Sequence, residues 1–151
     1  MTIFNNIDFW LSRKILAILR HLEYQQHIIE QKRIHFKNFP KDVSFGKISQ
    51  ICSPECISVG EKTGFGDWVF LTAWSSFRCI IDGKETIQNF MPDLTIGENC
   101  YFGAFNHITC INKIKIGNRL LTGKWVTITD NSHGNTDINT LNTEPIKRPL
   151  Y

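Results

Sequence analysis

His133 is the side chain in this sequence with the clearest potential for chemistry, and it lies in a run of small polar residues, Asp130-Asn131-Ser132-His133-Gly134. A neutral imidazole near pH 7 can remove a proton from a hydroxyl group as that oxygen attacks an electrophile. A histidine beside a glycine can equally be an exposed loop residue. Asp130 and Asn131 could orient the imidazole or contact a substrate, or they could be ordinary polar residues of a corner. The secondary structure expected around these residues helps to distinguish these interpretations.

The segment that leads to His133 carries a six-residue repeat, in which an aliphatic or aromatic residue is followed by glycine. A repeat of this kind predicts the architecture directly. It predicts coils over residues 96–113 and 116–133, which begin 20 residues apart. Phe45-Gly46 followed by Ile51 indicates an earlier, shorter coil. The clearest repeats are Val59-Gly60, Phe65-Gly66 and Leu71, then Ile96-Gly97, Phe102-Gly103 and Ile108, then Ile116-Gly117, Thr122-Gly123 and Ile128.

This spacing predicts a mainly β fold, a left-handed parallel β-helix, in which each hexapeptide forms one short strand and one corner and three hexapeptides complete a coil. The first residue of each unit points inward, and burying such an aliphatic side chain contributes roughly 1.5–3 kcal/mol. Glycine in the second position suits a tight corner or a positive φ. A β-sandwich of short strands is the competing fold, but a six-residue recurrence fits it poorly. The fifth residues are also expected to point inward: Thr63, Val69, Cys100, Asn106, Leu120, Val126 and Ser132.

Residues 1–42 are predicted to form an amino-terminal helical segment. Its apolar residues between positions 7 and 22 fall on one face of an α-helix, and Arg13 and Arg20 lie away from that face. A second helical stretch is predicted from Tyr24 to about Arg33. The segment could cover the open end of the β-helix, or residues 7–22 could lie on an anionic membrane surface as a basic amphipathic helix.

Residues 43–134 are predicted to form the β-helix, and residues 75–92 interrupt its repeat. Asp82-Gly83 between two strand-like stretches indicates a hairpin with a type I′ turn, inserted as a loop. Phe77, Phe90 and Met91 are expected to pack this hairpin down. Residues 135–151 are predicted to be an extended loop.

Composition excludes several classes of protein. The formal net charge of +3 is too small, and the aromatic residues too little interleaved with basic ones, to indicate nucleic-acid binding. Residues 1–41 carry seven Lys and Arg against three Asp and Glu, so the basic excess is local to the amino-terminal segment. No run of 18 apolar residues and no cleavable signal is evident. The cysteines form no Cys-x-x-Cys pair, which favours reduced thiols and a cytoplasmic protein, either free or peripheral at the inner face of a membrane. They are Cys52, Cys56, Cys79, Cys100 and Cys110.

The chain resembles the hexapeptide-repeat O-acetyltransferases, most closely those that act on sugars of surface polysaccharides and are related to the maltose and galactoside acetyltransferases. The resemblance covers Pro92 to Tyr151, and more weakly residues 43–91. It rests on three stretches and the closing residues: Asn106-His107-Ile108, Asn112-Lys113-Ile114-Lys115-Ile116-Gly117, Thr127-Ile128-Thr129-Asp130-Asn131-Ser132-His133-Gly134 and Arg148-Pro149-Leu150-Tyr151.

The resemblance implies transfer of an acetyl group from acetyl-CoA to a hydroxyl of a sugar or polysaccharide precursor, with His133 as the general base and a homotrimer as the assembly. It also places Asn106, His107, Asp130 and Asn131 near the acceptor. Asn106 is at the same time an inward position and could belong to a buried polar ladder. The family shows Asn-x-Asn where this chain has Ala104-Phe105-Asn106, so the acceptor is expected to differ.

Members of the family continue with further coils that hold most of the acetyl-CoA site, and no residue of this chain is assigned to it. Residues 1–151 could therefore be the amino-terminal part of an acetyltransferase, a short protein completed by a partner, or a non-catalytic scaffold. End-to-end association at an exposed lower coil is also expected. A zinc enzyme of the γ-carbonic anhydrase kind needs three convergent histidines, and only two of the five lie in the repeats, so no metal is expected.

Overall fold

The computed structural model describes residues 9–23, 35–47, 49–134, 138 and 141–151. The chain divides into two compact units, Met1–Ile34 and His35–Tyr151. In the first unit the described residues form one α-helix over residues 9–23. Two cationic side chains lie over aromatic rings on this helix, with Lys14 Nζ 4.1 Å from the Trp10 ring and Arg13 Cζ 5.8 Å from the Phe9 ring. The second predicted helix, Tyr24 to Arg33, lies outside the described residues.

The second unit begins at His35, eight residues before the predicted boundary at Val43. Backbone hydrogen bonds tie the intervening segment to the coils, because Lys37 N–H donates to Ile57 O at 2.9 Å and Val59 N–H donates to Asn38 O at 3.1 Å. The rings of Phe36 and Phe39 stack at 4.9 Å, with Phe36 5.9 Å from Phe45. Residues 35–42 therefore belong to the β unit rather than to the helical segment.

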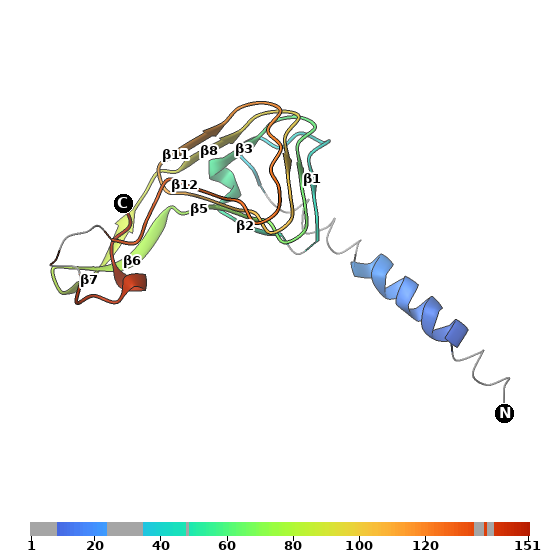
Figure 1. The fold of residues 1–151 in the computed structure, drawn as a ribbon, viewed down its shortest axis with the longest axis horizontal. Coiled ribbons are helices and arrows are strands. Elements are labelled where there is room, and N and C mark those ends of the chain that lie inside the picture. The colour runs from blue at the N-terminus through green and yellow to red at the C-terminus, as the bar shows by residue number, and fades with distance from the viewer. Residues whose placement is uncertain (1–8, 24–34, 48, 135–137, 139–140) are drawn as a thin grey trace. The chain divides into compact units, whose positions relative to one another are not determined.

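Three parallel sheets form the body of the second unit, with strand orders β1-β4-β9, β2-β5-β10-β12 and β3-β8-β11. The chain visits the three sheets in turn, so every strand pairs with the strand of the next coil rather than with its neighbour in sequence (Figure 1). The strands of these sheets are β1 (Ser44–Phe45), β2 (Gln50–Cys52), β3 (Ile57–Val59), β4 (Gly64–Phe65), β5 (Phe70–Ala73), β8 (Asp93–Ile96), β9 (Tyr101–Phe102), β10 (His107–Cys110), β11 (Lys113–Ile116) and β12 (Thr127–Thr129), with a short 3-10 helix η1 (Pro54–Cys56) before β3.

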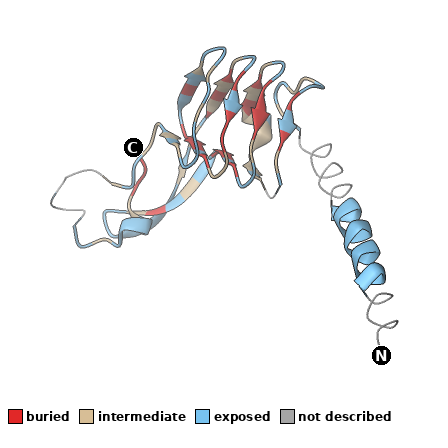
Figure 2. Cartoon of the chain, turned by 45° about the vertical axis from the view of Figure 1, so that its right-hand side comes forward, coloured by how far each residue is buried: buried red, intermediate tan, exposed pale blue. Residues whose placement is uncertain are grey.

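The register confirms the repeat that the sequence predicts. Ile96 pairs with Ile116 and His107 with Thr127, each a step of 20 residues. Phe45 pairs with Phe65 and Ile51 with Leu71, so the earlier, shorter coil is also present. Inward residues of the middle coils are almost fully buried, whereas the helix over 9–23 is exposed (Figure 2). The buried apolar interior comprises Val43, Phe45, Ile57, Val59, Phe65, Val69, Leu71, Ala73, Leu94, Ile96, Cys100, Phe102, Ile108, Cys110 and Ile114.

The corner glycines are needed for a different reason from the one expected, because none of those in the repeat has a positive φ. A Cβ at Gly60 would lie 2.6 Å from the Gly97 carbonyl carbon, and one at Gly97 would lie 2.7 Å from that of Gly117. Glycine therefore lets the backbone of the next coil approach. The left-handed conformation falls two residues later, on non-glycine residues with φ from 55° to 63°: Lys62, Trp68, Asn99, Phe105, Arg119 and Trp125.

The predicted hairpin is confirmed. β6 (Ser76–Ile81) and β7 (Lys84–Asn89) pair antiparallel, and both residues of the turn have positive φ, 50° at Asp82 and 73° at Gly83, as a type I′ turn requires. Met91 does not pack the hairpin down, because it is 92% exposed. In the final segment, whose residues 135–137 and 139–140 lie outside the described part, η3 (Pro145–Lys147) is a short 3-10 helix rather than an extended loop.

Candidate active site

His133 lies four residues beyond the end of β12, where the last described coil meets the hairpin and the end of the chain. Its backbone forms an antiparallel bridge with Leu150. Its ring meets the Phe77 ring edge to face, with 5.3 Å between centroids and 64° between planes. The residue remains exposed. The imidazole is thus held on one side by an aromatic ring and open to solvent on another.

Hydrogen bonds fix the backbone on both sides of His133. Ser132 N–H donates to Tyr151 O at 3.0 Å and Tyr151 N–H donates to Ser132 O at 3.2 Å. Gly134 N–H donates to Pro149 O at 2.7 Å, and Gly134 has a φ of 75°, which glycine adopts without strain. The chain therefore places His133 on a short ladder rather than on a free loop.

The hairpin holds the other side of this ladder through one side chain. The Gln88 amide accepts a hydrogen bond from Leu150 N–H at 2.8 Å and donates one to Leu150 O at 3.3 Å. Because Gln88 is on β7 and Phe77 is on β6, both strands of the hairpin contribute to the surroundings of His133. Sequence reasoning did not place either residue there, since the contact joins an insertion to a coil edge that is distant in sequence.

Asp130 and Asn131 do not orient the imidazole in this conformation. The Asp130 carboxylate accepts hydrogen bonds from Ile111 N–H and Asn112 N–H, both at 2.9 Å. Asn131 donates its amide to Thr109 O at 3.4 Å and to Asp130 Oδ1 at 3.3 Å. Among the residues that the structure describes, none forms a hydrogen bond with the His133 ring nitrogens. Asp130 instead closes the corner of the preceding coil.

The surroundings of Asp130 perturb two ionisable groups. Partial burial raises the pKa of the Asp130 carboxyl, but the hydrogen bonds from the Ile111 and Asn112 amides outweigh burial and hold this pKa below its ordinary value. Burial, assisted by the hydrogen bond to Asp130, raises the pKa of the Cys110 thiol to about 11. Cys110 is therefore protonated near pH 7 and is a poor nucleophile. Both groups contact the corner of the coil in this structure.

The other two predicted residues lie apart from His133. Asn106 is fully buried: its amide donates to Thr122 Oγ1 and its carbonyl oxygen accepts from Val126 N–H at 2.8 Å. It forms the buried polar ladder that the sequence left as an alternative. His107 is exposed at the start of β10, where its ring meets Phe70 edge to face at 5.9 Å. No contact among the described residues joins His107 to His133.

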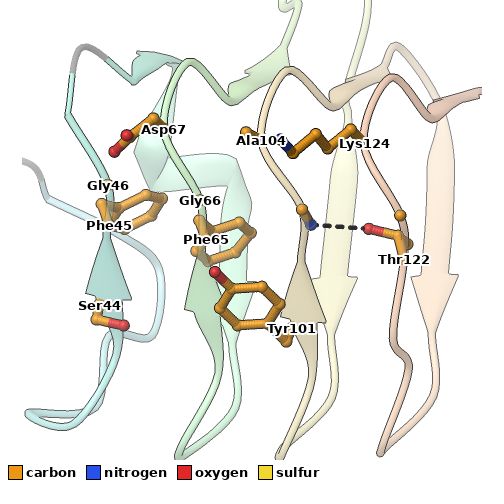
Figure 3. A pocket seen from close by; sticks show the side chains of 12 residues that line it. Ser44, Phe45, Gly46, Phe65, Gly66, Asp67, Tyr101, Ala104, Thr122 and Lys124 are labelled. Atoms are coloured by element: carbon orange, nitrogen blue, oxygen red, sulfur yellow. Dashed lines mark hydrogen bonds between the residues drawn. The ribbon is translucent and has the colours of Figure 1, made fainter.

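A separate hollow of about 580 Å³ lies where the β1-β4-β9 sheet meets the next corner (Figure 3). Glycines form part of its lining, and its polar side chains are Ser44, Asp67, Tyr101, Thr122 and Lys124. Asp67 already accepts a hydrogen bond from Lys47 N–H at 2.7 Å. Ala104, which stands where the resembling family has an acceptor-contacting Asn, lines this hollow, whereas none of His133, His107, Asp130 and Asn131 does.

All five cysteines carry free thiols. Within the described ranges, no group of three or more His, Cys, Asp or Glu side chains is arranged to hold a metal ion. Comparison of the chain with protein-family models, with curated proteins and with solved structures finds no match in any of the three.

Proposed function

We propose that this chain is an O-acetyltransferase whose parallel coils form a left-handed β-helix, and that His133 is its general base. The acetyl donor is acetyl-CoA, and the acceptor is a hydroxyl of a sugar or a surface-polysaccharide precursor. One observation carries the proposal: the histidine of the Asp-Asn-Ser-His-Gly corner is exposed on a backbone that hydrogen bonds fix on both sides. A rigid support with an accessible ring is what a general base needs.

The chemistry requires one proton carrier. The neutral imidazole of His133 takes the proton of the acceptor hydroxyl as its oxygen attacks the thioester carbonyl, and a carbon–oxygen bond forms. When the tetrahedral intermediate collapses, the carbon–sulfur bond breaks and the imidazolium returns the proton to the departing thiolate. A thioester is already activated, so no covalent intermediate on the protein is required. Phe77 limits the rotation of the ring during this cycle.

The competing proposal is a β-helix scaffold without catalytic activity, or one that needs a partner to complete the coenzyme site. It is favoured by the hydrogen bonds of Asp130, which join the carboxylate to Ile111 and Asn112 and leave His133 without a polar partner among the described residues. General bases usually have such a partner to set the tautomer.

Acetyl transfer measured by mass spectrometry of the acceptor distinguishes the two proposals. We expect His133→Ala to lower kcat by about 10²–10⁴-fold with an unchanged Tm. His35→Ala is the matched control, because it removes another exposed histidine, and it should retain full activity. Activity that survives in His133→Ala would refute the assignment. A wild-type chain that folds but binds no acetyl-CoA in calorimetry would favour the scaffold.

A second proposal concerns the helix over residues 9–23, which we infer lies on an anionic membrane surface. No described helix is long and apolar enough to cross a membrane. At 100° per residue, Arg13 and Arg20 lie opposite an aliphatic face, and Lys14 lies at its flank. Such a helix binds a surface through both its apolar area and its charge. The aliphatic face is 49–59% exposed and consists of Leu11, Ile15, Ile18, Leu19 and Leu22.

Vesicle flotation tests the membrane proposal. We expect the full chain to float with vesicles that contain phosphatidylserine and not with pure phosphatidylcholine. Ile15→Asn with Leu19→Asn should lower the partition coefficient at least 10-fold, since each aliphatic side chain contributes roughly 1.5 kcal/mol or more on burial. Ala17→Asn lies on the opposite face and is the control. Equal flotation of the double variant and the control would contradict the proposal.

A further inference from the structure

The corners of the coils share a hydrogen bond in which a side chain of one coil accepts a backbone amide of the coil before it. The Asp67 carboxylate accepts Lys47 N–H at 2.7 Å. In a second corner, Asn118 Oδ1 accepts Glu98 N–H at 3.1 Å. In the third corner, the Asp130 carboxylate accepts two backbone amides. This fold therefore fills its corner amides with side-chain oxygens, and in two of the three corners the oxygen belongs to a carboxylate.

Two corner amides beside the β1-β4-β9 sheet lack such an oxygen. Lys47, Asp67, Ala104 and Lys124 occupy the same position in successive coils, since the carbonyl oxygens of the first three each accept an N–H from the coil that follows, at 2.9–3.2 Å. Ala104 has a methyl group where Asp67 has a carboxylate, and the Lys124 ammonium group can only donate. The amides of Asp67 and Ala104 therefore have no acceptor among the residues that the structure describes.

Glycines of the preceding coils leave both amides uncovered. A Cβ at Gly46 would collide with the Asp67 nitrogen, and one at Gly66 would lie 2.8 Å from the Ala104 nitrogen. Asp67, Ala104 and Lys124 all line the hollow of about 580 Å³ (Figure 3). Neighbouring coils pair like strands of a sheet, about 4.8 Å apart, so oxygens of one small group can reach both N–H groups.

The charge around these two amides favours an anion. The Lys124 side chain extends toward Ala104 in Figure 3, and Lys47 adds a second cation to the same column. The one acid of the column, Asp67, already holds Lys47 N–H on the side away from Ala104. An anion at the two amides therefore meets two backbone donors and an ammonium group.

The corner that follows β3 provides a contrast. Glu61 N–H occupies the equivalent place after Gly60, and it too has no acceptor within the described ranges. The side chains of this position in successive coils are Glu61 and Glu98, however, and two acids repel an anion. A free amide alone is therefore common to both corners, whereas the pair of amides beside a lysine belongs to the corner at Asp67 and Ala104.

We propose that the amides of Asp67 and Ala104, together with the Lys124 ammonium group, bind an oxyanion, the carboxylate or phosphate group of a small molecule. One oxygen accepts Asp67 N–H, as the Asp67 carboxylate accepts Lys47 N–H one coil earlier. A second oxygen accepts Ala104 N–H, and Lys124 pairs with the charge. Hydrogen bonds from backbone N–H groups to an ionised oxygen are stronger than neutral ones. The site lies on the side of the stack and uses none of the residues around His133.

Amide NMR spectra of the full, ¹⁵N-labelled chain test the site directly. Sodium acetate and sodium phosphate are titrated separately, with sodium chloride keeping the ionic strength constant. We expect the Asp67 and Ala104 resonances to shift and saturate with at least one of the two anions, while the Glu61 resonance stays in place. The tighter of the two anions identifies the group that the site prefers. Shifts that do not saturate, or that are as large at Glu61, would overturn the proposal.

Two substitutions test the donors and the charge separately. Ala104→Asp gives Asp67 N–H a carboxylate of the protein itself, so it should weaken anion binding at least about 10-fold without lowering Tm. Lys124→Gln should weaken it roughly 2–5-fold, as expected for an exposed charge.

Lys115→Gln, an exposed change on β11, is the matched control for Lys124→Gln and should leave the affinity unchanged. Undiminished binding by Ala104→Asp, or equal losses from the two lysine substitutions, would contradict the site. These measurements involve no acetyl transfer, so they succeed or fail separately from the proposed activity.

Discussion

The interior of the coil stack is covered in different ways at its two ends. At the end formed by residues 35–52, rings cover the interior: Phe39 lies 6.4 Å from Phe45, and Phe45 stacks on Phe65 at 4.4 Å. At the other end, Thr122 follows Phe102 in the same column. The aromatic column therefore changes into a polar one toward the open end.

The polar groups at the open end are satisfied from within the stack. Thr122 Oγ1 accepts hydrogen bonds from Gly103 N–H at 3.1 Å and from the Asn106 amide (Figure 3 shows Thr122 with the first of these bonds). A buried amide with its partners in place is stable where an unpaired one would not be. One end is therefore closed by apolar area. At the other end the interior contains a polar side chain whose hydrogen bonds are satisfied within the stack.

The largest expected change in the free energy of unfolding comes from substituting two glycines that lie one coil apart, Gly97 and Gly117. Gly97→Ala should lower the free energy of unfolding by roughly 3 kcal/mol, because its Cβ would meet the backbone of Gly117 and Asn118. Gly117→Ala should raise it by about 0.4–1 kcal/mol, because its Cβ meets nothing and alanine restricts the unfolded chain. Urea unfolding measures both.

Equal losses from the two substitutions would contradict the comparison, since they would mean that Gly117 is as tightly packed as Gly97. Glu85→Ala, on the exposed hairpin, serves as the control for a neutral change of surface residue.

The sequence predicted the coils but not this difference between them. Ile96-Gly97 and Ile116-Gly117 are the same pattern and pair in the same register, so the six-residue period determines both equally. What separates them is whether another coil lies beneath, which is a tertiary property. The same limit applies to the corner glycines. The local pattern predicts a tight corner or a positive φ, whereas the close approach comes from the next coil, 20 residues further along the chain for Gly97 and 37 for Gly60.

An intermediate effect is expected at Asp130, which joins the open coil to the corner above it. Asp130→Ala should lower the free energy of unfolding by about 1–3 kcal/mol at pH 7, because the amides of Ile111 and Asn112 lose their acceptor. Lys115→Ala, an exposed change on β11, is the control and should shift it by less than about 0.5 kcal/mol.

The pH dependence of the free energy of unfolding tests the role of Asp130 independently. The pKa of Asp130 is lowered in the folded chain, so the carboxylate stabilises the fold above its ordinary pKa of about 3.9, and this stability is lost as the pH falls through the lower folded value. Asp130→Ala should therefore lose less stability than wild type below pH 4 in acid-unfolding curves. Parallel curves for the two proteins would show that the carboxylate is not tied to the corner.

Asp130 also shows why the site was harder to predict than the fold. Its place three residues before His133 suggested a role beside the imidazole. The donors that determine its orientation are the backbone N–H groups of Ile111 and Asn112 in the preceding coil. Side-chain identity does not show which backbone N–H groups are left free to bond. Phe77 and Gln88 were missed for a related reason, because a hairpin's position over a coil edge depends on how the insertion folds back.

The smallest effect is expected at Trp125, on the corner of the open coil. Its left-handed backbone, with φ 63°, is unfavourable for an aromatic residue by roughly 1 kcal/mol and tolerable for asparagine. Its ring stacks on Phe105 at 4.3 Å and 6°, which contributes about 0.5–1.5 kcal/mol. Because the two terms nearly cancel, Trp125→Asn should change the free energy of unfolding by less than about 0.5 kcal/mol.

Trp125→Ala separates the two contributions, because it removes the ring stack but does not bring asparagine's tolerance of the left-handed region. Its free energy of unfolding should be about 1 kcal/mol lower than that of Trp125→Asn. The difference between the two variants in urea unfolding then reports backbone strain at the open end. If both variants lost the same amount, the corner would carry no strain, and the stack on Phe105 alone would account for tryptophan at this position.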